Sequence, residues 1–296
     1  MTMDESEKPL DEMRAEIDRI DAALQDLIQR RAGVVEAIAA AKARLPGVAG
    51  VAFHPAREAQ ILRRLVTDNR GPLPATSMAL IWRTLIGVFL RFQTPLSIAL
   101  CGGDDPLGFQ DLVRAHFGAA LPIRIHDGAD QVVGAVARDD QVIGVLPLPL
   151  DDEPSPWWPT LANEDTSTPR IVARLPFVDV VGAANPGAAA LVLAQAPPCR
   201  SGADTTFVVI TTDDAVSRTG LVEWLNRSGQ AAVTIDSRCQ TSPGGAWLHL
   251  ARIPGYLETG AEILDPLCEV SDGVVTRIVS VGGFPDPIRV TGEERS

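Results

Sequence analysis

Lysine is nearly absent from this chain of 296 residues, in which 26 side chains are basic but only Lys8 and Lys42 are lysines. Cysteine is also scarce, and its four positions show no paired spacing, which indicates reduced thiols in a cytoplasmic protein rather than a disulfide framework. The cysteines lie at positions 101, 199, 239 and 268. Histidine matches no zinc or iron pattern, so no metal centre is predicted. The histidines lie at positions 54, 116, 126 and 249.

Long apolar runs are missing as well. The longest, MALIWRTLIGVFLRF at 78–92, is shorter than a bilayer span and contains Arg83 and Arg91. The first ten residues, MTMDESEKPL, are polar and acidic and do not resemble a secretory signal. We therefore expect a cytoplasmic protein without a membrane partner.

Clusters of positive charge are absent too, and the charge that is present divides the chain. Residues 1–95 carry 13 basic and 12 acidic side chains, whereas residues 96–296 carry 13 basic and 26 acidic ones. An acidic surface argues against nucleic acid as a partner, because phosphate neutralisation needs clustered Lys and Arg. The change in balance indicates different modules on the two sides of residue 95.

The sequence pattern of the first module, residues 1–95, predicts three helices. In the first, apolar residues recur with helical spacing over about 35 residues, so this helix is expected to pair with another helix along its length. A Pro/Gly loop at 45–55 follows, and Pro55 suits the first turn of the second helix. The expected helices cover residues 10–44, 56–69 and 74–93.

Four pieces of this module carry a family resemblance. They are Arg14, LIQRRAGVVEAIAAAK (27–42), PAREAQIL (55–62) and IWRTLIGVFLRFQ (81–93). In this order, residues 10–93 resemble the all-helical chorismate mutases of the AroQ class over the whole of that domain. The resemblance implies an all-α, three-helix mutase domain over residues 1–95. It also implies an isomerase of aromatic amino acid biosynthesis that converts chorismate to prephenate without a cofactor or a metal.

The resemblance further implies roles for individual residues. Arg14 and Arg31 would hold the two carboxylates of chorismate, since guanidinium groups match planar anions. Lys42 and Gln93 would donate to the ether oxygen, which gains negative charge as its C–O bond breaks. The compact ammonium group of lysine suits a single oxygen atom better than the planar guanidinium group of arginine does. This preference explains why one of the rare lysines stands at position 42.

Four other positions belong to the same implied substrate site. Glu58 would accept a hydrogen bond from the ring hydroxyl, with Arg57 beside it. Two residues depart from the family pattern. His54 stands where an Asp is usual, and Phe89 stands where a Ser commonly helps to bind the ring carboxylate. Phe89 cannot donate a hydrogen bond, and the alternative is that it packs in the core.

The length of the first helix predicts a dimer. Arg14 and Lys42 are 28 residues apart, which is roughly 42 Å along a straight helix. A substrate of this size cannot bridge that distance. An antiparallel two-fold dimer of the long helix would bring Arg14 of one subunit to Arg31 and Lys42 of the other. The family forms such intertwined homodimers with two shared sites.

Residues 96–203 are typical of an α/β region, with a Gly turn after the first strand. An acidic, Pro-rich excursion at 151–169 contains Trp157 and Trp158, which we expect to anchor the loop. Other short apolar runs predict strands, and one amphipathic run predicts a helix. The expected strands are 96–103, 141–150, 170–182 and 189–195, and the helix is 111–121.

This region weakly resembles prephenate dehydratase, in SIALCGGDDPLGFQDLVRAHF, QVIGVLPLPLDD and PRIVARLPF. One lobe of that family's two-lobed fold is mostly missing. Pro149 and Leu150 replace a Glu and an Asn of the family's turn. Ala188, Ala189 and Ala190 replace the motif that carries its catalytic Thr. We therefore expect a truncated, degenerate region that has lost dehydratase activity.

Residues 204–290 alternate as βαββαβ, the order of the ferredoxin-like fold, and resemble an ACT domain. Two motifs are similar to those with which the ACT domains of dehydratases bind phenylalanine. They are Thr219-Gly220-Leu221 and Asp236-Ser237-Arg238. The resemblance therefore implies that these six residues bind phenylalanine as an effector. The alternative is that the ACT fold is kept only as a scaffold for the dimer.

Three functions follow from these observations. The first is an active, homodimeric chorismate mutase with a vestigial dehydratase region. The second is a non-catalytic regulatory or binding protein that reuses the mutase and ACT folds. The third, a bifunctional mutase–dehydratase, is disfavoured by the missing lobe and the lost motifs.

Overall fold

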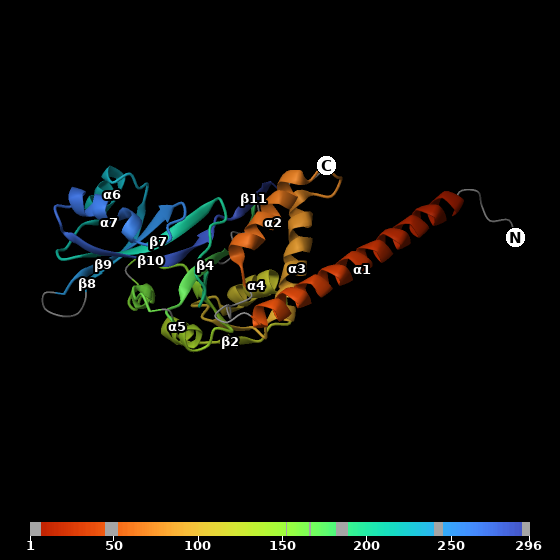
Figure 1. The fold of residues 1–296 in the computed structure, drawn as a ribbon, viewed down its shortest axis with the longest axis horizontal. Coiled ribbons are helices and arrows are strands. Elements are labelled where there is room, and N and C mark those ends of the chain that lie inside the picture. The colour runs from red at the N-terminus through yellow and green to blue at the C-terminus, as the bar shows by residue number, and fades with distance from the viewer. Residues whose placement is uncertain are drawn as a thin grey trace. The chain divides into compact units, whose positions relative to one another are not determined.

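The computed structural model describes residues 7–44, 53–151, 153–165, 167–181, 189–239 and 245–291. The chain divides into two compact units, residues 1–49 and 50–296. The first unit holds one long helix, α1 (Glu7–Ala43) (Figure 1). Helix α1 confirms the predicted first helix, and an alanine-rich sequence favours it in its second half.

The second unit begins with two helices, α2 (Pro55–Asp68) and α3 (Ala75–Gln93). They agree with the two predicted helices to within one residue at each end. Pro55 occupies the first turn of α2, where its missing N–H costs nothing, and the chain leaves α3 just before Pro95. The two helices lie side by side (Figure 1).

The rest of the second unit is built on a nine-stranded mixed sheet of order β2-β1-β3-β6-β4-β10-β7-β9-β8, and β5 pairs with β11 in a separate two-stranded sheet. The strands are β1 (Ser97–Leu100), β2 (Ile123–Ile125), β3 (Val142–Pro147), β4 (Arg170–Leu175), β5 (Val178–Val181), β6 (Ala190–Ala194), β7 (Asp204–Thr212), β8 (Val233–Cys239), β9 (Trp247–Pro254), β10 (Val275–Pro285) and β11 (Ile288–Thr291). The helices are α4 (Pro106–Phe117), α5 (Ala129–Arg138), the 3-10 turn η1 (Trp158–Leu161), α6 (Arg218–Arg227) and α7 (Ala261–Val270).

The α/β region confirms the expected strands and corrects three details. Helix α4 starts at Pro106 rather than at 111, because the Asp105 side chain accepts a hydrogen bond from the Gly108 N–H and caps it. Strand β2 and helix α5 were not predicted. Strand β2 is short, and the β-branched valines of α5 favour a strand over a helix. The single run expected at 170–182 divides at Pro176 into β4 and β5, which belong to different sheets.

The last segment follows the predicted βαββαβ order. Strand β7 lies between β10 and β9, and β8 forms the outer edge, so the four strands have the 4-1-3-2 order of the ferredoxin-like fold. Helices α6 and α7 cover one face of these strands (Figure 1). Strand β10 also meets β4 at Gly282 and Ile171, so one sheet continues from the α/β region into the ferredoxin-like segment.

Alternating side chains along the strands pack into two hydrophobic cores, one on each face of the sheet. On the first face, Ile98 and Leu100 of β1 pack in one cluster with residues of α2, α3 and α4. On the other face, Ala99 packs with α5 and with both Trp157 and Trp158. The two tryptophans are almost wholly buried, which confirms that they anchor the loop. The core of α2 and α3 is therefore continuous with the core of the sheet.

Helix α3 extends the apolar run at 78–92 to 19 residues, and by length and composition alone it could cross a membrane. The predicted apolar run at 78–92 lies within this helix, which continues beyond the run at both ends. One side of α3 packs in the core, including Ile86 and Leu90. The opposite side exposes apolar residues.

Candidate active site

The predicted site residues of the first unit all lie on α1. Arg14 is exposed and forms an ion pair with Asp11 one turn earlier, at 3.2 Å between Nη1 and Oδ1. Pairs of this kind on a helix surface contribute little to stability, so Arg14 can exchange Asp11 for another anion. Arg31 and Lys42 follow on the same helix, and Lys42 lies in its last turn.

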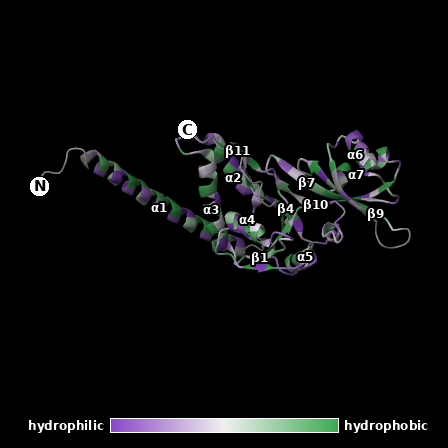
Figure 2. Ribbon diagram, turned by 180° about the vertical axis from the view of Figure 1, so that it is seen from behind, coloured by the Kyte–Doolittle hydropathy of each residue, from purple (hydrophilic) through white to green (hydrophobic). Residues whose placement is uncertain are grey.

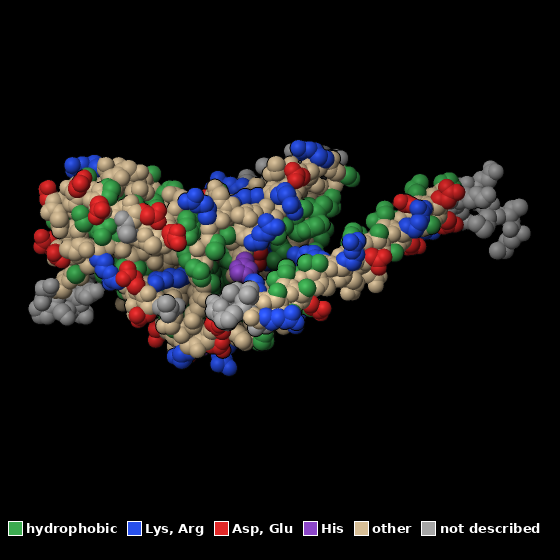
Figure 3. Space-filling view, viewed as in Figure 1, with side chains coloured by type: hydrophobic (Ala, Val, Ile, Leu, Met, Phe, Trp, Pro, Cys, Tyr) green, Lys and Arg blue, Asp and Glu red, His purple; other side chains and the backbone are tan. Residues whose placement is uncertain are grey.

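Apolar side chains form an exposed seam along α1. Their spacing alternates between three and four residues, which is the pattern of a coiled-coil helix that packs against a second helix. Figures 2 and 3 show apolar positions recurring along the helix. The seam consists of Leu10, Met13, Ile17, Ile20, Leu24, Leu27, Val34 and Ile38, each between 45% and 62% exposed.

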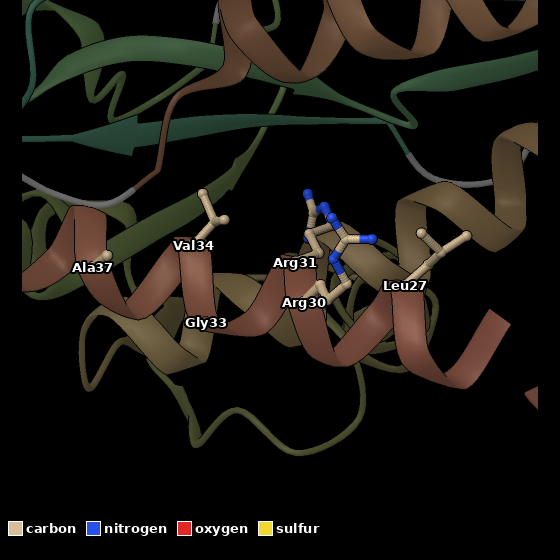
Figure 4. Close-up of a pocket in the computed structure, with 6 residues that line it drawn as sticks. All are labelled: Leu27, Arg30, Arg31, Gly33, Val34 and Ala37. Carbon is tan, nitrogen blue, oxygen red and sulfur yellow. The ribbon is translucent and has the colours of Figure 1, made fainter. Parts of the chain in front are cut away.

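Arg31 occupies the seam position between Leu27 and Val34. An open hollow of about 600 Å³ is lined there by residues of α1. Figure 4 shows Arg31 projecting from the same side of the helix as Leu27 and Val34. Arg31 is thus a partly buried cation within an otherwise apolar seam.

Residues His54, Arg57 and Glu58 cluster at the start of α2. His54 precedes the helix, and its backbone carbonyl accepts a hydrogen bond from the N–H of Glu58 at 3.1 Å. The exposed side chain of Arg57 points away from the core. Glu58 instead shares the buried face of α2 with Ala59 and Leu62.

Glu58 is held by an arginine that the sequence analysis did not assign to the site. Nη1 of Arg83, on α3, donates to Oε2 of Glu58 at 2.5 Å, and both side chains are at least 93% buried. The signal for this pair was present, since a charged residue interrupts the apolar run at 78–92. Its partner could not be found from spacing, because it lies 25 residues away on another helix.

Aromatic groups from outside the helical segment pack near Arg83. Its guanidinium lies 5.8 Å from the ring centre of Phe177, a cation–π contact. His116, at the end of α4, is buried beside Phe177 with ring centres 5.3 Å apart. Burial, together with the nearby charge of Arg83, holds the pKa of His116 well below its ordinary value, so this ring is neutral.

Phe89 and Gln93 lie one turn apart at the end of α3. Phe89 is 4% exposed and contacts Phe92 with ring centres 6.1 Å apart. Phe89 therefore packs in the core, as the alternative predicted. Its side chain has no hydrogen-bond donor for a carboxylate. Gln93 is the last residue of the helix and is partly exposed, so its amide remains accessible.

Comparison with known proteins identifies this helical segment. The model of the type II chorismate mutase family matches residues 13–94. Residues 13–94 are a type II chorismate mutase domain. This domain contains every residue predicted for the mutase site, from Arg14 to Gln93.

Curated relatives of the chain combine two enzymes. The bifunctional chorismate mutase/prephenate dehydratase of Pseudomonas aeruginosa is 30% identical over 138 residues, which are 46% of this chain and 38% of that protein. The protein of the same description from Neisseria gonorrhoeae is 36% identical over 107 residues, 36% of this chain and 28% of that protein. The chain thus spans well under half the length of these relatives.

Among solved structures, prephenate dehydratase from Streptococcus mutans covers 66% of this chain and 99% of its own. Its identity is 12% and its TM-score is 0.43.

The residues predicted to replace the dehydratase motifs lie in the α/β region. Pro149 is buried, Leu150 is 65% exposed, and Ala190 is the first residue of β6. Ala189 precedes it, and Ala188 lies outside the described residues.

The first predicted effector motif opens α6. Thr219 is exposed, and the N–H of Gly220 donates to Oγ of Ser217, which caps the helix. Leu221 is fully buried in the core beneath α6 and α7. Arg218, the residue before the motif, forms an ion pair with Asp151 from the loop that follows β3.

The second predicted effector motif lies on β8, and its polar groups bond within the chain. Nε1 of Trp158 donates to Oδ2 of fully buried Asp236 at 3.0 Å. Ser237 Oγ lies 2.8 Å from Nδ1 of His249. The backbone of Arg238 pairs with Leu248, and its side chain lies outside the described part of the structure.

Proposed function

We propose that the chain is an active, homodimeric chorismate mutase. The observation that carries this proposal is the set of ionic and polar residues inside the type II mutase domain: Arg14, Arg31, Lys42, Glu58 and Gln93. All five residue types that the family uses at these positions are retained. A domain that had become a purely regulatory scaffold would have no physical reason to keep a cation, Arg31, at a position of the apolar seam.

The reaction is a pericyclic rearrangement, so catalysis rests on holding chorismate in a folded geometry and stabilising charge. Arg14 and Arg31 bind the two carboxylates in bidentate fashion. Lys42 and Gln93 donate to the ether oxygen, whose negative charge grows as the C–O bond breaks. Glu58 accepts from the ring hydroxyl and fixes the orientation of the ring. No nucleophile or general base is required.

The dimer brings these groups together. The exposed seam of α1 calls for a second helix, and a second copy of α1 offers the same seam. The midpoint of Glu7–Ala43 is residue 25, so antiparallel pairing about it sets position 14 of one subunit opposite about position 36 of the other. That position lies between Arg31 and Lys42. Each site then takes Arg14 from one subunit and Arg31 with Lys42 from its partner.

The outer face of α3 supplies further apolar surface for the dimer. Leu80, Ile81, Val88 and Phe92 are each between 45% and 55% exposed. Figure 3 shows apolar side chains gathered where α3 lies. Burying such residues against a partner stabilises the assembly in proportion to the area removed from water.

The remaining segments serve as a scaffold in this proposal. The region at 96–203 carries no hydroxyl at the place of the dehydratase motif, so prephenate is released rather than dehydrated. The ferredoxin-like segment at 204–290 is an ACT domain whose second motif is closed by Trp158. This contact favours the scaffold alternative over regulation by phenylalanine.

One assay of the purified protein tests the function. Chorismate consumption and prephenate formation are measured without added metal or cofactor, together with phenylpyruvate formation from prephenate at neutral pH. Wild type should consume chorismate and form no phenylpyruvate above background. Lys42→Ala should be slower by about 10²–10³-fold, the usual effect of removing one preorganised donor. A folded wild-type dimer that leaves chorismate untouched would establish the non-catalytic alternative.

A further inference from the structure

The side chain of Glu58 accepts one hydrogen bond from the described residues, and this bond leaves half of the carboxylate unused. Nη1 of Arg83 donates this hydrogen bond to Oε2, whereas Oε1 accepts no hydrogen bond from the described residues. An ionised carboxylate has two oxygens and about four acceptor sites. Oε1 therefore retains its capacity to accept from a hydroxyl group.

A buried carboxylate needs a compensating charge. Glu58 is 6% exposed, and in a site closed to water an uncompensated anion would be strongly unfavourable. Arg83 is 3% exposed and supplies the opposite charge on the side of Oε2. With this cation in place, Glu58 can remain an ionised acceptor inside the protein.

Arg83 is itself held by the α/β region. In the described part of the chain, its Nε and Nη2 atoms are buried without hydrogen-bond partners. The ring of Phe177, between β4 and β5, meets the guanidinium instead, and neutral His116 of α4 adds no second positive charge. These contacts restrict the guanidinium to the orientation in which it meets Glu58.

We propose that Arg83 is a positioning residue of the mutase site, which fixes Oε2 of Glu58 so that Oε1 can receive the ring hydroxyl of chorismate. The proposal rests on the proposed function, in which Glu58 binds that hydroxyl. It assigns a task to the truncated α/β region, because Phe177, with His116 packed against its ring, contacts Arg83 from outside residues 13–94. Arg83 acts through Glu58 and does not touch the substrate.

The test is a double-mutant cycle on the full-length dimer with Arg83→Met, Glu58→Gln and the combination of both. Arg83→Met should reduce kcat/KM by about 10²-fold, since misplacing a positioned group by about 1 Å has an effect of this order. It should also change KM and kcat in the same proportion as Glu58→Gln does. In the Glu58→Gln background, Arg83→Met should cost less than about threefold, because its route of action is already removed.

Arg83→Lys and Arg63→Met complete the design. Arg83→Lys keeps a cation beside Oε2, so it should restore part of kcat/KM, and it replaces Arg83→Met if that variant does not fold. Arg63 lies on α2, as Glu58 does, but outside the mutase site. It donates hydrogen bonds to the backbone carbonyls of Ser201, Ala203 and Asp286. Arg63→Met should therefore lower thermal stability while leaving KM and kcat at wild-type values.

Three results would overturn the proposal while wild type is active. They are normal kinetics of folded Arg83→Met, full additivity in the double mutant, and an increase in kcat/KM, which would mean that Arg83 holds Glu58 away from the substrate. Inactive wild type would instead refute the proposed function, so the two failures are distinguishable.

Discussion

Gly87 of α3 lies against the backbone of Phe117 at the end of α4. A Cβ atom at position 87 would be 3.1 Å from both the carbonyl carbon and the carbonyl oxygen of Phe117. A helix of the mutase domain thus touches a helix of the α/β region with no side chain between them. This close approach also brings His116, the neighbour of Phe117, towards Arg83.

Substitution of Gly87 tests this contact. Gly87→Ala should lower the free energy of unfolding by about 1 kcal/mol and Gly87→Val by about 3 kcal/mol, because the helix backbone at Phe117 cannot yield easily. Urea unfolding measures both values. Gly134→Ala on α5 is the control, since its Cβ would meet only the flexible end of Arg138. This control should be neutral or stabilising, and an equal loss in both would contradict the close contact.

Removal of the Trp158 donor tests the buried bond to Asp236. Trp158→Phe keeps an aromatic ring but leaves Oδ2 of Asp236 without its indole donor, which should cost about 1–3 kcal/mol. Trp157→Phe is the matched control, because Trp157 is also almost wholly buried and its indole N–H donates to no described residue. Thermal unfolding of both variants provides the comparison. If Trp157→Phe is as damaging, lost packing rather than the hydrogen bond accounts for the effect.

Addition of L-phenylalanine tests the scaffold alternative for residues 204–290. Asp236 and Leu221 are fully buried, so these two side chains of the motifs are not accessible to a ligand. A ligand at 100 times its Kd would stabilise the protein by about 2.7 kcal/mol. We expect millimolar L-phenylalanine to change neither Tm nor mutase activity. A concentration-dependent rise in Tm would show that the ACT-like segment binds the amino acid.

Acid should weaken the ferredoxin-like segment through His249. Burial lowers the pKa of His249 from 6.5 to about 4. Between these values the unfolded state binds a proton that the native state excludes, so stability falls as pH drops from about 6.5 to 4. At pH 5 the loss is about 2 kcal/mol. Urea unfolding at pH 7.5 and 5 should show a smaller difference for His249→Gln than for wild type, and equal differences would contradict a neutral His249.

Subunit exchange tests the shared sites. Lys42→Ala and Arg14→Ala should each be inactive, yet their mixture should regain activity. A mixed dimer has one site with both defects and one site with neither, so about a quarter of all sites become intact at random pairing. Lys42→Ala mixed with Arg31→Ala is the control and should stay inactive, because both residues belong to the same half-site. An inactive first mixture despite confirmed exchange would mean that Arg14 acts within its own chain.

Local patterns in the sequence predicted the helices of the mutase domain, the seam of α1 and the residue types of the candidate site. These features repeat every few residues, so local spacing reveals them. Local patterns also predicted the βαββαβ order of the last segment, because periodic strands and helices alternate there.

Which side chains contact each other depends instead on how distant elements pack in three dimensions. The pairs Glu58–Arg83, Arg83–Phe177 and Trp158–Asp236 join residues 25, 94 and 78 positions apart. A periodic pattern tells which face of an element is apolar, but it carries no information on which distant element covers that face. Burial of Glu58 and Asp236 follows from that packing, and with it the need for a specific cation or donor beside each carboxylate.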